Sequence, residues 1–138
     1  MKARVKLVEG MTFVAESGSG HAVVMDASPD VGGRDLGARP MELVLMGTGG
    51  CSAIDVVHIL RKARQAISDC VVELEAERAA EDPKVFTRIH MHFVVTGKGL
   101  SNTQVERAVK LSKEKYCSAS IMLAKTAEIT ADFEIRET

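Results

Sequence analysis

The stretch GTGGCSAID, residues 47–55, places three glycines and a cysteine inside a segment that otherwise has the pattern of one long apolar helix. An interior glycine costs a helix roughly 0.5–1 kcal/mol relative to alanine, so three of them need a physical reason. Either another part of the structure approaches the helix backbone closely here, or the helix breaks at the glycines. The two alternatives predict different surroundings for Cys51.

The residues around this stretch predict a helix from Met41 to about Ala66, with Pro40 at the favoured first helical position. One face of this helix follows the i, i+3/i+4 spacing. That face consists of Val44, Gly47, Thr48, Cys51, Ile54, Asp55 and His58. Apolar side chains cover most of the remaining surface as well, which is typical of a helix that is buried nearly all round.

The rest of the chain predicts short strands and a second helix. Alternating polar and apolar residues at 3–7 and 11–15, with a third run at 21–26, indicate an antiparallel meander, followed by a glycine-rich loop at 28–40. Residues 70–77 and 88–95 predict a hairpin, and residues 101–116 a helix that opens with a capping box of Ser101 and Gln104. Residues 127–135 predict a half-buried antiparallel strand. With no βαβ alternation, the predicted class is α+β, in a single domain spanning residues 1–138.

Composition limits the partners and the location of the protein. The 138 residues carry a formal net charge of −1 and no basic stripe, which argues against nucleic acid as a partner. The N-terminus lacks the apolar core of a signal peptide, and no run approaches the roughly 18 apolar residues of a membrane span. We therefore expect no membrane partner and a cytoplasmic location.

Three cysteines without a CxxC motif describe neither a secreted disulfide framework nor a zinc knuckle. Cys51 is either a small hydrophobe on a buried helix or a reactive thiol. If the helix breaks at the glycines, Cys51 lies near a positive helix N-terminus that favours the thiolate. If the helix continues, the positive charge must come from an arginine elsewhere. Cys117, between a helix end and a new turn, is open to both interpretations, whereas Cys70 has an inward strand position that indicates core.

Two imidazoles, those of His90 and His92, share one strand face and lie across the predicted hairpin from Glu73, Glu75 and Glu77. A metal site there is conceivable, but solvated cross-strand pairs are commoner, and HxH without a fixed third ligand is a weak signal. Neither glycine-rich stretch has the spacing of a phosphate-binding loop. We expect no metal and no cofactor.

Several of these features together resemble the osmotically induced protein C and organic hydroperoxide resistance family (OsmC/Ohr), and most closely its YhfA-like branch. They are the glycine-rich loop, the central-helix segment RPMELVLMGTGGCSAIDVV at 39–57, and the segment KYCSASIML at 115–123 after the second helix. The most specific parts are the Pro-x-Glu entry, the Gly-Gly-Cys sequence and the spacing of 66 positions from Cys51 to Cys117. The resemblance covers essentially the whole chain.

The resemblance implies an OsmC-like fold, with antiparallel sheets packed around a long buried central helix in an intertwined homodimer. It implies thiol-dependent reduction of small-molecule organic hydroperoxides, with Cys51 as the peroxidatic cysteine, Cys117 as the resolving cysteine and an external dithiol as reductant. The glycines at 47, 49 and 50 would then let the other helix or the partner subunit come close. A non-enzymatic small-molecule-binding dimer is the alternative function, and a purely structural dimer with inert cysteines is a third.

The sequence departs from the family pattern near the thiols. Family peroxidases usually carry an acidic residue ten positions before the first cysteine, where this chain has Met41, and the acid Glu42 stands one step later. Ser118 follows the second cysteine in place of the usual proline. Arg34 and Arg39, in or beside the glycine-rich loop, are the candidates for the cation that holds the thiolate, with Glu42 as the supporting acid. These departures affect the activating groups more than the fold.

Overall fold

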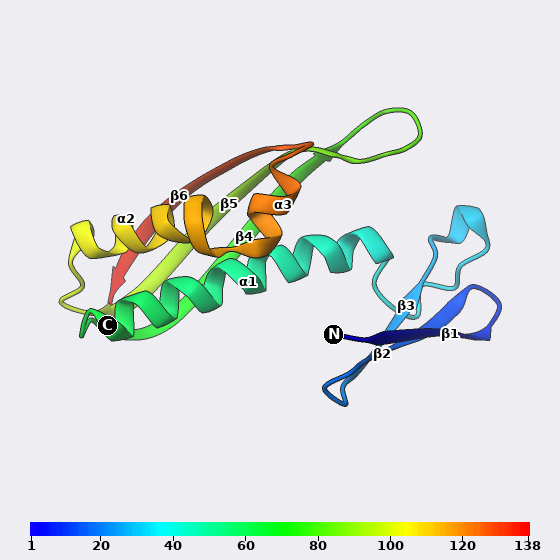
Figure 1. Cartoon of the computed structure of the whole chain (residues 1–138), viewed down its shortest axis with the longest axis horizontal. Coiled ribbons are helices and arrows are strands. Elements are labelled where there is room, and N and C mark those ends of the chain that lie inside the picture. The colour runs from blue at the N-terminus through cyan, green and yellow to red at the C-terminus, as the bar shows by residue number, and fades with distance from the viewer. The chain divides into compact units, whose positions relative to one another are not determined.

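The computed structural model describes every residue from Met1 to Thr138 and divides into two compact units, residues 1–44 and 45–138. Helix α1 (Pro40–Lys62) begins in the first unit and continues into the second (Figure 1). The expectation that residues 1–138 form a single domain stays a prediction.

The first unit is a three-stranded antiparallel sheet of β1 (Ala3–Glu9), β2 (Thr12–Ser17) and β3 (Ala22–Asp26), in the order β1-β2-β3. The meander predicted from the sequence is confirmed. A single 3₁₀ turn, Pro29–Val31, interrupts the loop that follows β3. Short glycine turns connect the strands because the alternating pattern leaves few residues between them.

A buried carboxylate, that of Asp26, fixes this loop. It accepts hydrogen bonds from the Thr12 hydroxyl at 3.1 Å and from the backbone N–H groups of Ala27 at 2.8 Å and of Arg34 and Leu36 at 3.2 Å each. Burial by itself would raise the pKa of Asp26, but the four donors outweigh burial and hold the pKa below its ordinary value. The loop that carries Arg34 is therefore tied to the end of β3.

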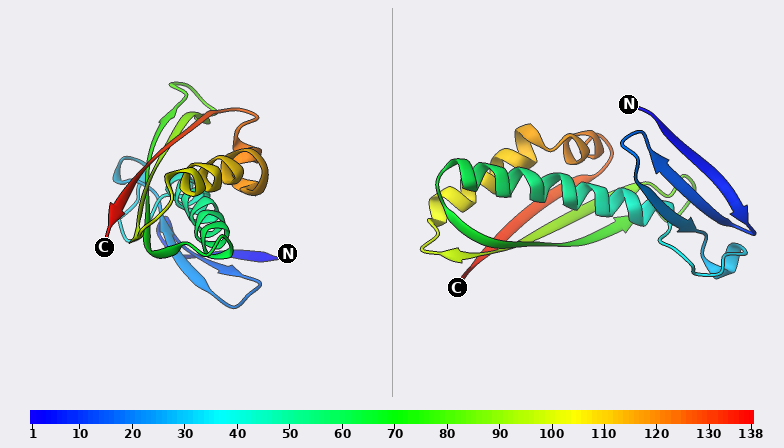
Figure 2. Two further views of the ribbon diagram at one scale, coloured as in Figure 1. Left: turned by 90° about the vertical axis from the view of Figure 1, so that its left-hand side faces the viewer. Right: turned by 90° about the horizontal axis from the view of Figure 1, so that it is seen from below.

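The second unit is a sheet of β4 (Ala66–Arg78), β5 (Phe86–Lys98) and β6 (Glu128–Glu137), with α1 and α2 (Asn102–Leu111) on the same side of it (Figures 1 and 2). The predicted hairpin is confirmed as β4 and β5, and its register places Glu73 opposite His92 and Glu75 opposite His90. The helices and β5 supply the core of the unit. Its fully buried apolar side chains include Val56, Leu60, Ile89, Met91, Phe93, Val95 and Val105.

The last strand differs from the sequence prediction. β6 pairs with β5 in the parallel direction, so the antiparallel arrangement expected for residues 127–135 is wrong, as is the expected absence of a βαβ crossover. The connection from β5 to β6 runs through α2 and the turns that follow it, and this length of chain returns to the end of the sheet at which β5 begins, so that β6 runs parallel to β5. Alternating side chains have a period of two in either direction, so they could not reveal the strand direction.

Of the three glycines at 47, 49 and 50, only Gly49 has a packing role within this chain. Helix α1 runs through them without a break, which excludes the alternative in which the helix ends there. A Cβ added at Gly49 would lie 2.6 Å from Cδ1 of Leu74 on β4, so this glycine allows α1 to approach the sheet. A Cβ at Gly47 or Gly50 would meet no atom within 4 Å, so nothing within the chain explains these two glycines.

Helix α1 is buried on one face only within this chain, through Thr48, Gly49, Ser52, Val56 and Leu60. The sequence predicted that α1 would be buried on nearly all sides, and this degree of burial is not reached within a single chain. Helix α1 has the length and the mean hydropathy of a membrane-spanning helix, 1.7 over its most apolar 18 residues, but polar residues such as Ser52 and Asp55 interrupt it, so it contains no apolar run of that length, as the sequence predicted. The core helix of a soluble protein has the same composition, and here the buried face packs within the second unit.

The C-terminal end of α1 lies at Lys62, four residues before the predicted end. The N–H of Gln65 donates to the carbonyl of Leu60, and the N–H of Arg64 donates to that of Arg61, both at 2.9 Å. These two bonds form a Schellman motif, which requires a left-handed residue after the helix. Arg64 occupies that position with φ of 58°.

Replacing Arg64 with glycine is therefore expected to stabilise the protein by about 0.5–1 kcal/mol. Glycine avoids the steric cost of the left-handed region, although its unfolded state gains some entropy in return. Urea denaturation of the wild type and of Arg64→Gly measures the difference. Arg61→Gly is the control, because a glycine inside the helix should destabilise by about 1 kcal/mol. Equal or lower stability of Arg64→Gly would contradict the prediction.

Candidate thiol site

The structure brings Cys51 and Cys117 together, although they lie 66 positions apart in the sequence. Cys51 lies in the middle of α1 and is half-buried, whereas Cys117 is fully buried between the end of the α2 segment and the start of α3 (Ser118–Leu123). The two thiols are near enough to interact, and this interaction with Cys51 is one of the influences that raise the pKa of Cys117. The site therefore contains two facing thiols, one accessible and one enclosed.

A π-helical turn, η2 (Ser112–Tyr116), places Cys117 at this point. The N–H of Cys117 donates to the carbonyl of Ser112 at 2.8 Å, a bond one residue longer than an α-helical one. The helix that the sequence predicted over residues 101–116 therefore does continue to Tyr116, as α-helix to Leu111 and as π-helix from Ser112, and it ends before Cys117. Cys117 then becomes the N-cap of α3, with its sulfur 3.4 Å from the N–H of Ser120.

The environment of Cys117 has opposing effects on its thiol. Burial is the largest influence and raises the pKa of Cys117. The hydrogen bonds with Ser120 act in the opposite direction, because they favour the thiolate, and the neighbouring Cys51 raises the pKa further. Cys117 also lies 3.9 Å from the carbonyl oxygen of Thr48, to which its thiol can donate. The net result is a thiol that stays protonated more readily than a free cysteine.

The unbroken helix decides between the two sequence hypotheses for Cys51. Since α1 continues from Pro40 to Lys62, no helix N-terminus lies beside Cys51. The dipole of α1 therefore cannot favour a thiolate at Cys51. Any positive charge that activates Cys51 must come from another element. This is the alternative in which an arginine is required.

The three supporting candidates, Arg34, Arg39 and Glu42, all belong to the first unit, and Cys51 and Cys117 belong to the second. Arg34 pairs with Glu9 at 3.4 Å. Arg39 forms an ion pair with Asp35 and lies 3.9 Å from the carboxylate of Glu42.

Within the first unit, these pairs have a clear structural role. Glu42 accepts a hydrogen bond of 2.8 Å from the N–H of Arg39 at the start of α1, as the glutamate of a capping box does. The hydrogen bond with Asp35 is the main reason that the pKa of Arg39 lies above its ordinary value. Arg39 therefore stays fully charged and is held by two acids next to the first turn of α1.

Sequence reasoning missed a buried chain of hydroxyl groups between α1 and η2. The hydroxyls of Ser52 and Ser112 lie 2.7 Å apart, and Ser112 donates to the Asp55 carboxylate at 3.0 Å. With that proton committed to Asp55, the Ser52 hydroxyl donates to Ser112. Polar residues at 52 and 55 on an apolar helix were the available signal, but their partner is far away in the sequence.

The third cysteine, Cys70, faces the helix side of the sheet, as its inward strand position predicted. Its exposure is intermediate, so the thiol is not fully enclosed within the chain. Burial, followed by the charge of Asp69, raises the pKa of Cys70. Both effects disfavour the thiolate, and Cys70 does not belong to the thiol pair.

His90 and His92 have carboxylate partners on β6 rather than on β4. A single oxygen of Asp132 lies 3.1 Å from Nε2 of His90 and 2.6 Å from Nδ1 of His92, and Nδ1 of His90 lies 2.7 Å from the Thr130 hydroxyl. The predicted glutamates do stand opposite on β4, but the parallel strand β6 supplies the closer acids. The two histidines thus form cross-strand pairs, the interpretation that the sequence favoured over a metal site.

The pair of His92 and Asp132 predicts a pH dependence of stability. The hydrogen bond with Asp132 raises the pKa of His92 above 6.5, and the bond with His92 lowers the pKa of Asp132 below 3.8. The contribution of His92 is complete below pH 6.5 and disappears as the pH rises through its folded-state pKa. The contribution of Asp132 is complete above pH 3.8 and disappears as the pH falls through its folded-state pKa.

We expect Asp132→Asn to bring the NMR titration midpoint of His92 down towards 6.5. The stability difference between wild type and variant should be largest near pH 5 and should shrink at alkaline pH, because neutral His92 no longer needs the charge. His21, which does not contact Asp132, is the internal control. An unchanged His92 midpoint would contradict the assigned pair.

Comparison with known proteins defines the class that the fold and the two thiols indicate. The family model described as OsmC-like protein matches residues 32–132, and the chain belongs to this family. Protein YhfA of Escherichia coli strain K12 is 53% identical over 135 residues, which cover 98% of each chain. The family and branch that the sequence resembles are therefore confirmed.

Solved structures agree with the OsmC-like fold. A hypothetical protein from Aquifex aeolicus VF5 has a TM-score of 0.87 and 30% identity, with 99% of this chain and 96% of that one covered. The organic hydroperoxide resistance protein OhrB of Bacillus subtilis has a TM-score of 0.64 and 18% identity, with 97% and 98% covered. At that identity, the likeness to OhrB concerns the fold alone.

Proposed function

We propose that the protein is a cytoplasmic, homodimeric peroxidase that reduces organic hydroperoxides through Cys51 and Cys117. The observation that carries the proposal is that a half-buried thiol on α1 lies near, and interacts with, a fully buried thiol at the start of α3. Membership of the OsmC-like family, and the likeness in fold to the organic hydroperoxide resistance protein OhrB, support the choice of substrate class.

In the first step, the Cys51 thiolate attacks the distal oxygen of the hydroperoxide. The O–O bond breaks, its electron pair leaves with the alkoxide, and proton uptake gives an alcohol. Cys51 is oxidised to the sulfenic acid. Cys51 suits this role better than Cys117, because it is the more exposed thiol of the two.

In the second step, the sulfur of Cys117 attacks the sulfur of the Cys51 sulfenic acid. A disulfide forms and water leaves. Burial protects Cys117 from direct oxidation by peroxide, and the Ser120 N–H stabilises its thiolate when Cys51 presents an electrophilic sulfur. An external dithiol then reduces the disulfide by thiol–disulfide exchange, which returns both thiols to the start of the cycle.

A homodimer is part of the proposal because α1 has an uncovered apolar face. Ile54 is 72% exposed and Met46 is 59% exposed, and the same helix carries Gly47 and Gly50 with open space beside them. A second α1 can approach such a face closely, and a dimer would remove large apolar side chains from water. The cytoplasmic location follows from the need for reduced thiols and a dithiol reductant.

Consumption of an organic hydroperoxide, such as cumene hydroperoxide, with dithiothreitol as reductant tests the proposal. The reaction should turn over repeatedly, and mass spectrometry after one equivalent of peroxide without reductant should find a Cys51–Cys117 disulfide. Absence of both turnover and disulfide would reject the peroxidase. The family fold and the uncovered face of α1 would then favour the alternative, a non-enzymatic small-molecule-binding dimer.

An activating arginine can be identified from the pH dependence of alkylation. We expect either Arg39→Ala or Arg34→Ala to move the iodoacetamide reactivity of Cys51 to higher pH, because the thiolate is the nucleophile and a nearby cation stabilises it. Cys70 should react slowly at neutral pH in all variants, since burial raises its pKa. Peptide mass spectrometry distinguishes the sites. If the pH dependence of Cys51 alkylation is unchanged in both variants, neither arginine activates the thiol. That result would favour the small-molecule-binding alternative, in which Met41, in place of the family's acid, has cost the site its activating pair.

A further inference from the structure

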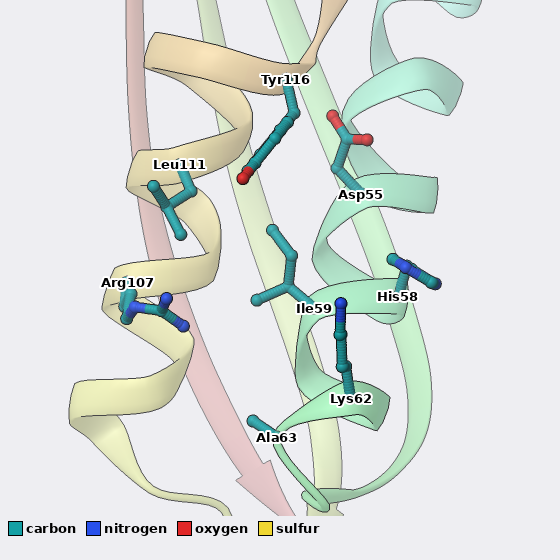
Figure 3. Close-up of a pocket in the computed structure, with 8 residues that line it drawn as sticks. All are labelled: Asp55, His58, Ile59, Lys62, Ala63, Arg107, Leu111 and Tyr116. Carbon is teal, nitrogen blue, oxygen red and sulfur yellow. The ribbon is translucent and has the colours of Figure 1, made fainter.

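A cavity of about 560 Å³ lies between α1 and α2, entirely within the second unit (Figure 3). Ile59 from α1, and Leu111 and Tyr116 from α2 and η2, point into the gap between the helices. The same figure shows His58 on the side of α1 that faces away from α2. A volume of this size is within the range of 300–1,000 Å³ that is typical of small-molecule sites.

Two cations on the wall of the cavity, Lys62 and Arg107, lack acidic partners. Neither belongs to any ion pair or side-chain hydrogen bond of the chain. They belong to different helices, so the fold and not one local sequence brings them to the same cavity. Arginine and lysine are the usual ligands of carboxylates and phosphates, and guanidinium can bind either in a bidentate manner.

The only acid in the cavity wall, Asp55, already accepts a hydrogen bond from Ser112 at 3.0 Å. That bond fixes its carboxylate at the end of the cavity nearest to Tyr116 (Figure 3). With Lys62 and Arg107 positive and Asp55 negative, the wall carries a net positive charge without counting His58. The charge therefore favours an anion.

We propose that this cavity binds a small organic oxyanion, with Lys62 and Arg107 on its carboxylate or phosphate group. Ile59 and Leu111 contact the apolar body of the molecule, and the Tyr116 ring can stack on it while its hydroxyl offers a hydrogen bond. Inorganic anions are poor ligands because they leave these apolar contacts unused. The proposal does not depend on peroxidase activity, since no thiol belongs to the cavity wall.

The cavity nevertheless adjoins the thiol site. Tyr116 directly precedes Cys117, and Asp55 follows Cys51 by one helical turn. The hydroxyl chain from Ser52 through Ser112 to Asp55 connects the two regions. A ligand in the cavity would contact side chains next to both cysteines without touching either sulfur.

NMR titration of the full-length protein, with labelled isoleucine and leucine methyl groups, tests the proposal. The two oxyanionic probes are 3-phenylpropionate and phenyl phosphate, and 3-phenylpropanol and inorganic phosphate are the matched controls. Saturable shifts should appear at the Ile59 and Leu111 methyls with at least one oxyanionic probe, and comparison of the two probes distinguishes a carboxylate from a phosphate ligand. The neutral alcohol should bind at least about tenfold more weakly, since it cannot form charge-assisted hydrogen bonds.

Substitution of each cation tests whether Lys62 and Arg107 bind the anionic group of the ligand. Arg107→Gln and Lys62→Gln should each weaken binding about tenfold or more. Lys110→Gln, also on α2 but lining a different cavity, should leave binding unchanged. Cys51→Ser should bind normally, so failure of the peroxidase would not affect this result. Absence of saturable shifts at Ile59 and Leu111, equal binding of the alcohol, or full binding by Arg107→Gln would overturn the proposal.

Discussion

Replacing Cys51 with serine is expected to abolish hydroperoxide consumption, with a loss on the order of 10³-fold or more. A serine hydroxyl is neutral at physiological pH and is not oxidised by peroxide, whereas a thiolate is the reacting species in the proposed first step. The variant should fold normally, because serine is close to cysteine in size and Cys51 is only half-buried. Steady-state consumption of cumene hydroperoxide with dithiothreitol measures the loss.

The other two cysteines supply the controls for this experiment. Cys117→Ser should still react with one equivalent of peroxide but should accumulate sulfenic acid on Cys51, detectable by dimedone labelling, since no resolving thiol remains. Cys70→Ser should keep full activity, because Cys70 lies outside the thiol pair. Full activity in Cys51→Ser would rule out the proposed mechanism. Loss of activity in Cys70→Ser at normal stability would show that the wrong pair was assigned.

A charge on the uncovered face of α1 is expected to dissociate the proposed dimer. Ile54 is 72% exposed in the single chain, so glutamate at this position costs little in a monomer. Within a dimer interface, the same carboxylate would be buried without a partner, and that costs several kcal/mol. We expect Ile54→Glu to weaken dimerisation about 100-fold or more. Sedimentation velocity over a range of micromolar concentrations measures the dissociation constant.

Two further variants make the test specific. Val71→Glu adds the same charge to the outer face of the sheet, where Val71 is 44% exposed, and should not change the dimer. The double variant Gly47→Ala, Gly50→Ala should weaken the dimer if two helix backbones meet at these glycines. In an uncovered helix, the same alanines would instead stabilise by about 0.5–1 kcal/mol each, since no atom of the chain lies nearby. A wild-type monomer at micromolar concentration would contradict the dimer.

The sequence by itself determined the features that depend on local periodicity. The alternation in residues 70–77 and 88–95 was enough to predict the β4–β5 hairpin with its inner and outer faces, because successive side chains on a strand point to opposite sides. Ser101 was identified as a helix cap, and its hydroxyl does accept from the Gln104 N–H at 3.3 Å. The Ser101 N–H donates at 2.8 Å to Oε1 of Gln65, which follows the end of α1, and not to the side chain of Gln104 as in a complete capping box.

The resemblance of the glycine–cysteine segment and of the region around Cys117 to a known family added what periodicity could not. It predicted the OsmC-like fold, which the family model and the solved relatives confirm. It also selected Cys51 and Cys117 as a pair, and the two thiols interact in the structure, but their pairing in a redox cycle stays a prediction. Their catalytic roles, and those of Arg34, Arg39 and Glu42, stay predictions that the experiments above test.

Only the tertiary structure decided the direction of β6, the packing role of Gly49 and the partners of His92. Each depends on an element distant in sequence: the crossover through α2 sets the direction of β6, Leu74 fills the space beside Gly49, and Asp132 arrives on a parallel strand. A periodic pattern shows which face of an element is apolar. It does not show what covers that face, because packing depends on contacts between residues whose separation along the chain carries no local signal.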